Sequence, residues 1–216
     1  MARLNVNPTR MELSNLKKKL ASARRGHRLL KDKRDELMRQ FMILIKENRR
    51  LRAEVEKGIT EANKYMSVAG SVMQREILET ALLMPKQEVE ISVDKKNTMS
   101  VEVPKFSSKF KTSNSNDIYS YGMAFTSIDL DGAVSALSSI FPKMIELAEI
   151  EKSCQLMADE IEKTRRRVNA LEHIMIPDYE ETIKFITMKL SENERSTTTS
   201  LLKVKDMVLK QNHNYQ

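Results

Sequence analysis

The chain is poor in the residues that build a compact core. Among its 216 residues there are five glycines, five prolines, no tryptophan and only 5% aromatic residues, whereas 31% are charged. A compact domain of this length would need more large apolar side chains to bury. The composition is typical of proteins made of long helices, and it indicates very little globular core.

Features of secreted and membrane-spanning proteins are also missing. Cys154 is the only cysteine, so no internal disulfide can form, and a reducing, cytosolic compartment is the natural interpretation. The N-terminus has no apolar signal-peptide core, and the longest dense apolar run, residues 41–45, is far shorter than the roughly 20 residues of a membrane span. We therefore expect any membrane association to pass through a partner.

Signatures of catalysis and of metal binding are absent as well. The three histidines, His27, His173 and His213, lie far apart, and the chain has no glycine-rich phosphate loop and no paired-cysteine metal spacing. Residues 129–132 have the wrong acidic spacing for a calcium loop. The sequence therefore predicts no catalytic residue, no cofactor and no metal site.

The chain contains instead two long runs, residues 8–78 and 131–210, in which apolar side chains recur every three or four residues. The first stripe comprises Leu13, Leu16, Leu20, Ala23, His27, Leu30, Arg34, Leu37, Phe41, Leu44, Asn48, Leu51 and Val55. The second comprises Leu147, Ile150, Cys154, Met157, Ile161, Thr164, Val168, Leu171 and Met175. Narrow stripes of this period are typical of supercoiled helices. We predict a mainly α fold, a long antiparallel intramolecular two-stranded coiled coil.

Signals for turns and caps divide the chain into three parts. The first helix should begin near Asn7 and Pro8, with Thr9 and Glu12 as a capping box, and should end before Pro85. Alternating apolar residues from Val89 predict a small β-hairpin, with its turn at residues 94–98 and a mobile loop over residues 104–121. The predicted parts are the N-terminal helix (1–84), the hairpin and loop at the bend (85–130) and the C-terminal helix (131–216).

The second helix should start near Asp131 and Gly132, and its pattern contains two prolines. Each proline removes a backbone donor and crowds the carbonyl group four residues earlier. Pro142 and Pro177 therefore predict bends or short interruptions near Ser138 and His173.

Polar residues interrupt the first stripe at His27, Arg34 and Asn48. Such residues reduce stability but fix the alignment of the helices, so we interpret them as register-setting. If paired positions add up to about 215, Arg34 faces Glu180 and Glu181; in a slightly different register it is solvent-exposed.

Positive charge is concentrated in the first helix. Fifteen Lys and Arg residues against five acids lie between Arg10 and Arg52, and the net charge of the whole chain is +7. A basic collar of arginines should point outward, towards carboxylates of other chains or towards solvent, because like charges cannot gain by facing each other. It comprises Arg49, Arg50, Arg165, Arg166 and Arg167.

Two sequence runs resemble a known family. Residues 7–13 and 23–35 are similar to the N-terminal helix of the D subunit of the V-type and A-type rotary ATPases. Residues 165–172, followed by Ile176-Pro177 and Thr182-Ile183, resemble the C-terminal signature of that family, although His173 stands where an aromatic residue is expected. The short tail after Lys210 resembles the prokaryotic members.

This resemblance implies a central rotor shaft, present in one copy per complex. Both termini (residues 1–28 and 181–216) would lie in the lumen of the catalytic A/B hexamer, which binds ATP and ADP, so the chain needs no cofactor of its own. The bend would meet the small F subunit of the central stalk and a C/d-type socket above the membrane ring. Partner contacts are expected at Arg10, at Leu201 and Leu202 and at the collar. The chain would lie at the cytoplasmic face of a prokaryotic plasma membrane and would bind the membrane only through partners.

Two other functions fit the basic helix. A nucleic-acid-binding coiled coil would bind duplex DNA with a steep salt dependence, although stacking aromatics are scarce. A curved membrane-surface dimer with basic flanks is the third possibility. The sequence does not reveal whether H⁺ or Na⁺ is transported, because ion selectivity belongs to the membrane ring.

Overall fold

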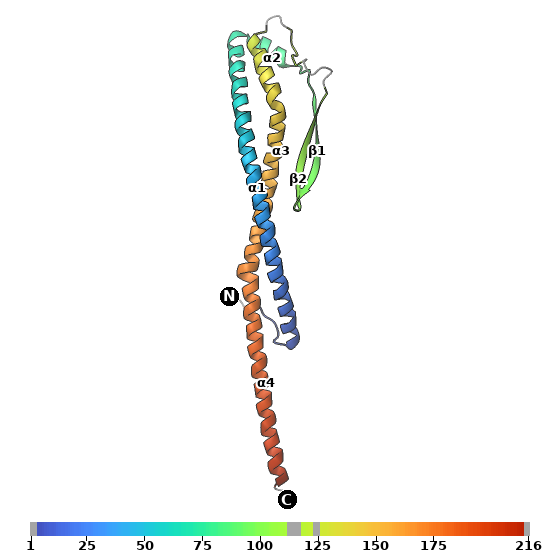
Figure 1. Cartoon of the computed structure of the whole chain (residues 1–216), viewed down its shortest axis with the longest axis vertical. Coiled ribbons are helices and arrows are strands. Elements are labelled where there is room, and N and C mark those ends of the chain that lie inside the picture. Colours follow the sequence, from blue (N-terminus) through green and yellow to red (C-terminus); the bar gives the residue numbers. More distant parts are fainter. Residues whose placement is uncertain (1–3, 112–117, 123–125, 214–216) are drawn as a thin grey trace. The chain divides into compact units, whose positions relative to one another are not determined.

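The computed structural model of the chain describes residues 4–111, 118–122 and 126–213, with side chains except at 110 and 210–213. The fold is mainly helical with one small antiparallel β-hairpin, as predicted (Figure 1). In chain order the elements are α1 (Arg10–Val72), α2 (Arg75–Leu82), β1 (Val89–Thr98), β2 (Val101–Phe110), α3 (Ile128–Ala170), the π-helix η1 (Leu171–Met175) and α4 (Ile176–His213).

The chain forms two compact units, which we describe separately. The terminal unit comprises Met1–Asp35 and Glu162–Gln216, and the central unit comprises Glu36–Ile161. In both units a segment of the N-terminal helix packs against a segment of the C-terminal helices. The boundary divides α1 and α3, so each of these helices belongs to both units.

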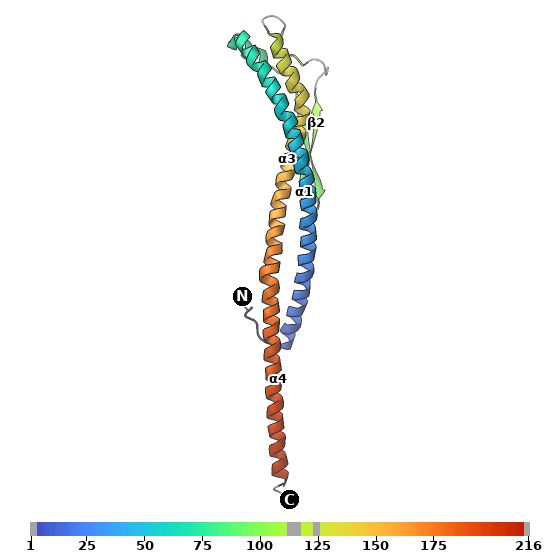
Figure 2. The same ribbon diagram turned by 60° about the vertical axis from the view of Figure 1, so that its left-hand side comes forward.

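In the terminal unit, the first part of α1 runs antiparallel to α4 (Figure 2). Thr9 caps α1, since its Oγ1 accepts a hydrogen bond from the Glu12 backbone N–H at 3.2 Å, which confirms that half of the predicted capping box. Leu16 on α1, Val168 on α3 and Ile186 on α4 are apolar and at most 2% exposed. Each lies at a position set by the three-to-four spacing of its helix.

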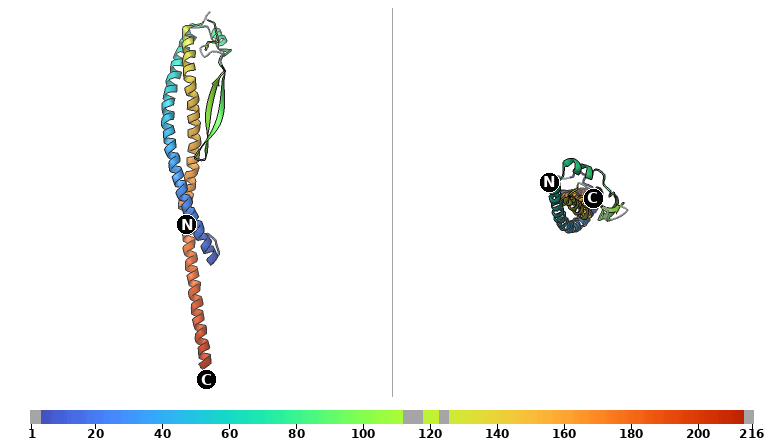
Figure 3. Two further views of the ribbon diagram at one scale, coloured as in Figure 1. Left: turned by 45° about the vertical axis from the view of Figure 1, so that its right-hand side comes forward. Right: turned by 90° about the horizontal axis from the view of Figure 1, so that it is seen from above.

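In the central unit, the second part of α1 packs against α3 (Figure 3). Many of the buried residues on both helices are small or branched, among them Leu51, Val55, Ala62, Ala69, Leu130, Ala133 and Ile140. Small side chains let the backbones approach closely. Gly58 lies against Ile140, and a Cβ placed on it would be 1.8 Å from the Ile140 Cδ1.

The two predicted stripes are the contact faces of the helices. Every residue of the first stripe is buried or half-buried, including the polar ones. The same holds for the second stripe except at Met175, which is 41% exposed. Met175 ends the π-helix, whose wider turn rotates its side chains away from the positions that regular α-helical spacing would give.

The N-terminal helix is shorter than predicted. Instead of continuing to Pro85, it is interrupted after Val72, and α2 follows from Arg75. Gln74 between them has an extended backbone, with φ −66° and ψ 141°. The apolar periodicity weakens beyond Val72, so packing no longer favours a continuous helix there.

The C-terminal helix differs from the prediction at two points. It begins at Ile128 rather than near Asp131, because the Ser127 Oγ accepts a hydrogen bond from the Asp129 backbone N–H at 3.2 Å and thereby caps it. The helix continues through Pro142, so no interruption is present near Ser138, and a bend there stays a prediction. Near His173 the predicted interruption is present as η1, directly before Pro177.

The hairpin is longer than predicted, and its turn lies elsewhere. The strands pair from Val89 with Phe110 to Thr98 with Val101, so only Met99 and Ser100 form the turn. Both have positive φ, 52° and 70°, and the Ser100 backbone N–H donates to Asn97 Oδ1 at 2.9 Å. The predicted turn at residues 94–98 therefore belongs to β1. The first part of the predicted loop, 104–110, belongs to β2, and residues 112–117 lie outside the described residues.

Candidate interaction surfaces

The end of α4 is the most exposed apolar surface of the terminal unit. All residues from 191 to 209 are exposed, and the apolar ones among them are Leu201, Leu202, Val204, Met207, Val208 and Leu209. Leu201 is 69% exposed and Leu202 57%, so both predicted contact residues are accessible. A helix that leaves this many apolar side chains in water is typical of a binding surface.

A run of hydroxyl residues precedes this apolar segment. Thr197, Thr198, Thr199 and Ser200 each donate a hydrogen bond from the side chain to the carbonyl group four residues earlier. These bonds hold the short side chains against the helix itself. Residues 196–200 are exposed, so this section of α4 is slender as well as unpaired with another helix in the described part of the unit.

Polar contacts set the alignment of α1 on α4. Arg10 Nη2 lies 2.5 Å from Glu194 Oε1, and Arg24 Nη2 lies 2.7 Å from Glu180 Oε1. The Leu4 backbone N–H donates to Thr182 Oγ1 at 3.3 Å, so the segment before α1 also follows α4 (Figures 1 and 2). Arg10, a predicted partner contact, is thus paired within the chain while 79% of its side chain stays exposed.

Of the two registers considered, the one in which paired positions add up to about 215 is wrong. Arg24, not Arg34, faces Glu180, and Arg34 binds its neighbour Asp35, with Nη2 2.7 Å from Oδ1. The prediction assumed that the two chain ends lie side by side. In the terminal unit α4 instead continues past the start of α1, which shifts every pairing along the helices (Figure 2).

His27 contacts the π-helix. Its Nε2 lies 3.2 Å from Glu172 Oε2, and only 20% of its side chain is exposed. The hydrogen bond to His27 lowers the pKa of Glu172. Asn48 is half-buried in the central unit. The register-setting role of His27, Arg34 and Asn48 stays a prediction.

The collar arginines are all exposed. Arg49 and Arg50 lie on α1 in the central unit, and residues 165–167 lie on α3 in the terminal unit. Arg166 forms an ion pair with Glu162 one turn earlier on the same helix. Each group is accessible to a partner from its own unit.

The hairpin packs onto the helices of the central unit. Val101 at the start of β2 joins a buried cluster with Leu37, Met157 and Ile161. Farther along β2, the Phe106 backbone N–H donates to Glu149 Oε2 on α3 at 2.8 Å. The hairpin therefore lies along α3, as Figures 1 and 3 show.

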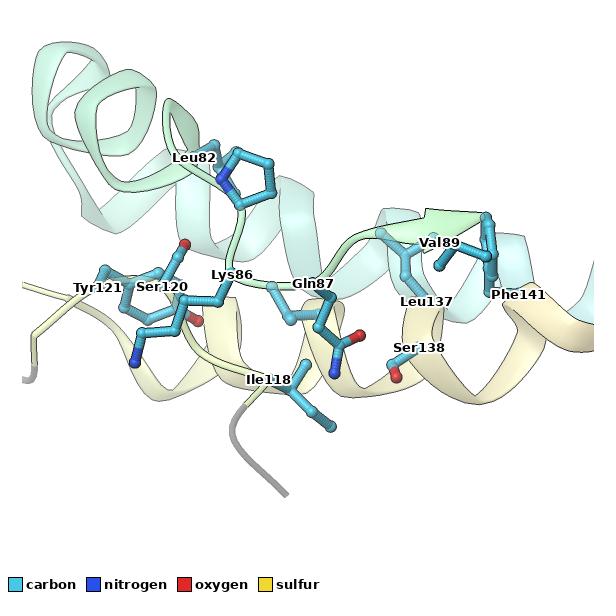
Figure 4. Close-up of a pocket in the computed structure, with 12 residues that line it drawn as sticks. Leu82, Lys86, Gln87, Val89, Ile118, Ser120, Tyr121, Leu137, Ser138 and Phe141 are labelled. Carbon is cyan, nitrogen blue, oxygen red and sulfur yellow. The ribbon is translucent and has the colours of Figure 1, made fainter. Parts of the chain in front are cut away.

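A cavity of about 310 Å³ lies between α2, the start of β1 and α3. Figure 4 shows Ser120 and Tyr121 at one end and Val89, Leu137 and Phe141 at the other. Tyr121 donates to Asp131 Oδ1 at 2.7 Å, and burial, followed by this bond, raises its pKa. Tyr121 therefore stays protonated at neutral pH.

The described residues contain neither a metal site nor a membrane span. Among the described residues, no group of His, Cys, Asp and Glu side chains is arranged to hold a metal ion. No helix in the described ranges is long and apolar enough to cross a membrane.

Cys154 is half-buried on the second stripe, and burial raises the pKa of its thiol.

Comparison with known proteins identifies the family. Residues 12–206 match the family model for the D subunit of ATP synthase. The chain is 60% identical to the D subunit of V-type ATP synthase from Clostridioides difficile strain 630 over 211 residues, 97% of this chain and 94% of the relative. It is 56% identical to the protein of the same name from Acetivibrio thermocellus over 216 residues, covering 100% of this chain and 97% of the relative. The chain therefore belongs to the family of ATP synthase D subunits, whose members are non-catalytic stalk subunits of V-type ATP synthases.

Proposed function

We propose that this chain is the central rotor shaft of a V/A-type rotary ATPase. It would transmit torque between ATP hydrolysis or synthesis in the catalytic A/B hexamer and ion transport by the membrane ring. The observation that carries the proposal is the exposed end of α4, which presents Leu201, Leu202 and further apolar side chains beyond the start of α1. Such a surface is expected where a helix inserts into surrounding protein.

The helix pairs supply the asymmetry that coupling needs. A pair of helices has no threefold symmetry, so each of three catalytic interfaces would meet a different face of the shaft. Contact energies then differ between orientations, and closure of one interface on nucleotide favours the next orientation. Such differential contact energy between states is the physical requirement for coupling two sites.

Partners follow from this arrangement. We assign residues 85–130 to the membrane-proximal end, near the small F subunit and the C/d-type socket, and the two helical parts, 1–84 and 131–216, to the shaft. Contacts with the membrane would be indirect, at the cytoplasmic face, and one copy would serve each complex. ATP and ADP would bind the A/B subunits. The shaft would need no cofactor.

Truncation of the α4 end tests the proposal. Removing residues 201–216 should reduce coupled rotation and ion pumping in the reconstituted complex, because the apolar contacts of Leu201 and Leu202 are lost. A finer variant, Leu201→Gln with Leu202→Gln, should have the same direction of effect. Leu29→Gln is the matched control, since Leu29 has the same 69% exposure as Leu201 but lies on α1. Unchanged torque and pumping after truncation would refute the proposal.

Charge reversal tests the collar. Replacing Arg165, Arg166 and Arg167 with Glu should loosen assembly, because the introduced carboxylates would repel acidic groups of surrounding subunits, which the native arginines would attract. The matching Arg→Lys triple variant keeps the charge and should assemble normally. If the Glu variant kept wild-type affinity for its partner subunits and wild-type turnover, the proposed contact of the collar with those subunits would be refuted.

A further inference from the structure

The β-hairpin has two outer edges, and the turn decides which backbone groups face them. Because only Met99 and Ser100 separate the strands, Thr98 and Val101 form the hydrogen-bonded pair that closes the turn. Bonded and non-bonded pairs alternate from there, so even-numbered residues of β1 bond to β2. The odd-numbered residues direct their N–H and C=O groups outward. The bond from the Lys111 backbone N–H to the Glu88 carbonyl, 2.9 Å, continues this alternation.

The outer edge of β2 is blocked at two positions. Pro104, which faces Lys95, has no N–H to offer. Phe106, which faces Val93, directs its N–H outward, where the carboxylate of Glu149 already accepts it at 2.8 Å. A proline and a bound carboxylate are devices that protect a strand edge from pairing.

Among the described residues, the outer edge of β1 has neither a proline nor a carboxylate bound to an outward N–H group. In the part of the chain that the structure describes, β1 pairs with no strand besides β2, and its residues 90–97 are all exposed. Ile91 is 47% and Val93 59% exposed, and their outward backbone groups lie at the same edge. An open, partly apolar edge of this kind is a template for a further strand.

Pairing of this edge with the same edge of a second copy places at least one unfavourable pair in each register. Symmetric antiparallel pairing must place odd-numbered residues opposite each other, because these carry the outward groups. The register that matches Ile91 with Val93 places Glu90 opposite Asp94, a pair of like charges. The next register matches Val93 with itself but sets Ile91 against Lys95. The register after that places the Asp94 residues of the two copies opposite each other, again a pair of like charges.

We infer that the outer edge of β1 accepts an extended strand of another subunit of the complex. The strand would run antiparallel, the more stable arrangement per residue. It would carry apolar side chains opposite Ile91 and Val93, and basic side chains opposite Glu90 and Asp94, because successive side chains alternate between the two faces. This inference rests on the proposed function in one respect, namely that the chain works inside a multi-subunit assembly.

Amide hydrogen exchange of the isolated chain and of the assembled complex tests strand addition. In the isolated chain the even-numbered amides of β1 are bonded to β2 and should exchange slowly, whereas those of Ile91, Val93 and Lys95 should exchange fast. Assembly should slow these three odd-numbered amides, with little change at the even-numbered ones. Unchanged exchange at the odd-numbered amides overturns the inference. Slowing that already grows with concentration in the isolated chain also overturns it, because a second copy would then be the occupant.

Proline substitution provides a functional test with a matched control. Ile91→Pro removes an outward N–H of β1 without breaking a bond to β2, and should weaken binding of the chain to its partner subunits about tenfold. Ser108→Pro is the control, since Ser108 lies opposite Ile91 and its N–H points to the blocked edge. It should change binding less than about twofold. Ile91→Thr keeps the N–H and separates the backbone effect from the loss of the apolar side chain.

The outcomes separate the inference from the proposed function. Equal losses in Ile91→Pro and Ser108→Pro, with the same helix content, would mean that the hairpin is merely destabilised, and would overturn the inference. Normal assembly of Ile91→Pro would also overturn it. Both results leave the truncation experiment on α4 unaffected, so loss of torque there would still support the shaft.

Discussion

Gly58 is a position at which α1 lies close against α3, and Gly58→Ala provides a sharp test of that packing. A Cβ at this position would lie 1.8 Å from Ile140 Cδ1 and 2.6 Å from Ile140 Cγ1. Contacts under 3 Å require that something moves. Ile140 is only 9% exposed, so its side chain has little free space in which to move.

Two opposing effects determine the result. Alanine is about 0.8–1 kcal/mol better than glycine inside a helix. Overpacking a close contact costs about 1–3 kcal/mol. We therefore expect Gly58→Ala to destabilise the chain by up to about 2 kcal/mol. Gly70 is the internal control, because it lies on the same helix in the same unit and a Cβ added there would have nothing within 4 Å. Gly70→Ala should stabilise by about 0.5–1 kcal/mol.

Urea unfolding followed by circular dichroism at the helical band measures both variants. Ile140→Val removes the methyl group nearest to the added Cβ, so in the Gly58→Ala background it should cost less than in the wild type. That coupling, taken from a double-mutant cycle, isolates the contact from helix propensity. The reasoning would be refuted if Gly58→Ala stabilised the chain as much as Gly70→Ala.

Three further predictions concern single side chains. Leu37 is fully buried, so Leu37→Ala should lower the free energy of unfolding by about 2–5 kcal/mol. Met38 is an exposed neighbour, and Met38→Ala should change this free energy by less than about 0.5 kcal/mol. Equal effects of the two variants in urea unfolding would argue against the buried cluster around Leu37. The bond to His27 lowers the pKa of Glu172 below its usual value of 4.5, so its contribution is present above that pH and is lost as the pH falls through the lowered pKa. The melting temperature of the wild type should therefore fall more than that of Glu172→Gln between about pH 5 and 3, and parallel curves would exclude this contribution. Burial raises the pKa of Cys154, so alkylation near neutral pH should be several-fold slower in the native chain than in urea; equal rates would contradict its position on the stripe.

The contact faces of the helices could be predicted because burial follows spacing. Every polar member of the first stripe, even Arg34, is at least half-buried, as its position in the repeat requires. The alignment of the helices could not be predicted in the same way. A stripe that repeats every seven residues fits its partner almost equally well after a shift of one repeat, and the actual pairing depends on contacts such as Arg24 with Glu180.

The turn of the hairpin shows a second limit. Residues 94–98 are polar and charged, which is typical of a turn, whereas Met99 and Ser100 are not the residues expected at positive φ. Pairing along the full length of both strands, and the contact of Val101 with the helices, outweighs this local preference. Likewise, the sequence alone treats Gly58 and Gly70 as equivalent helix breakers, since only the packing against Ile140 distinguishes them.

The hydroxyl run of α4 has a mechanical consequence for any protein that encloses it. Thr197 to Ser200 have already committed their side-chain hydrogens to their own helix, and no long side chain projects from them. A protein that surrounds this section would find few protruding side chains to contact. Strong contacts with such a protein must then come from the flanking turns, namely the charged turn around Glu194 and the apolar segment from Leu201 onward.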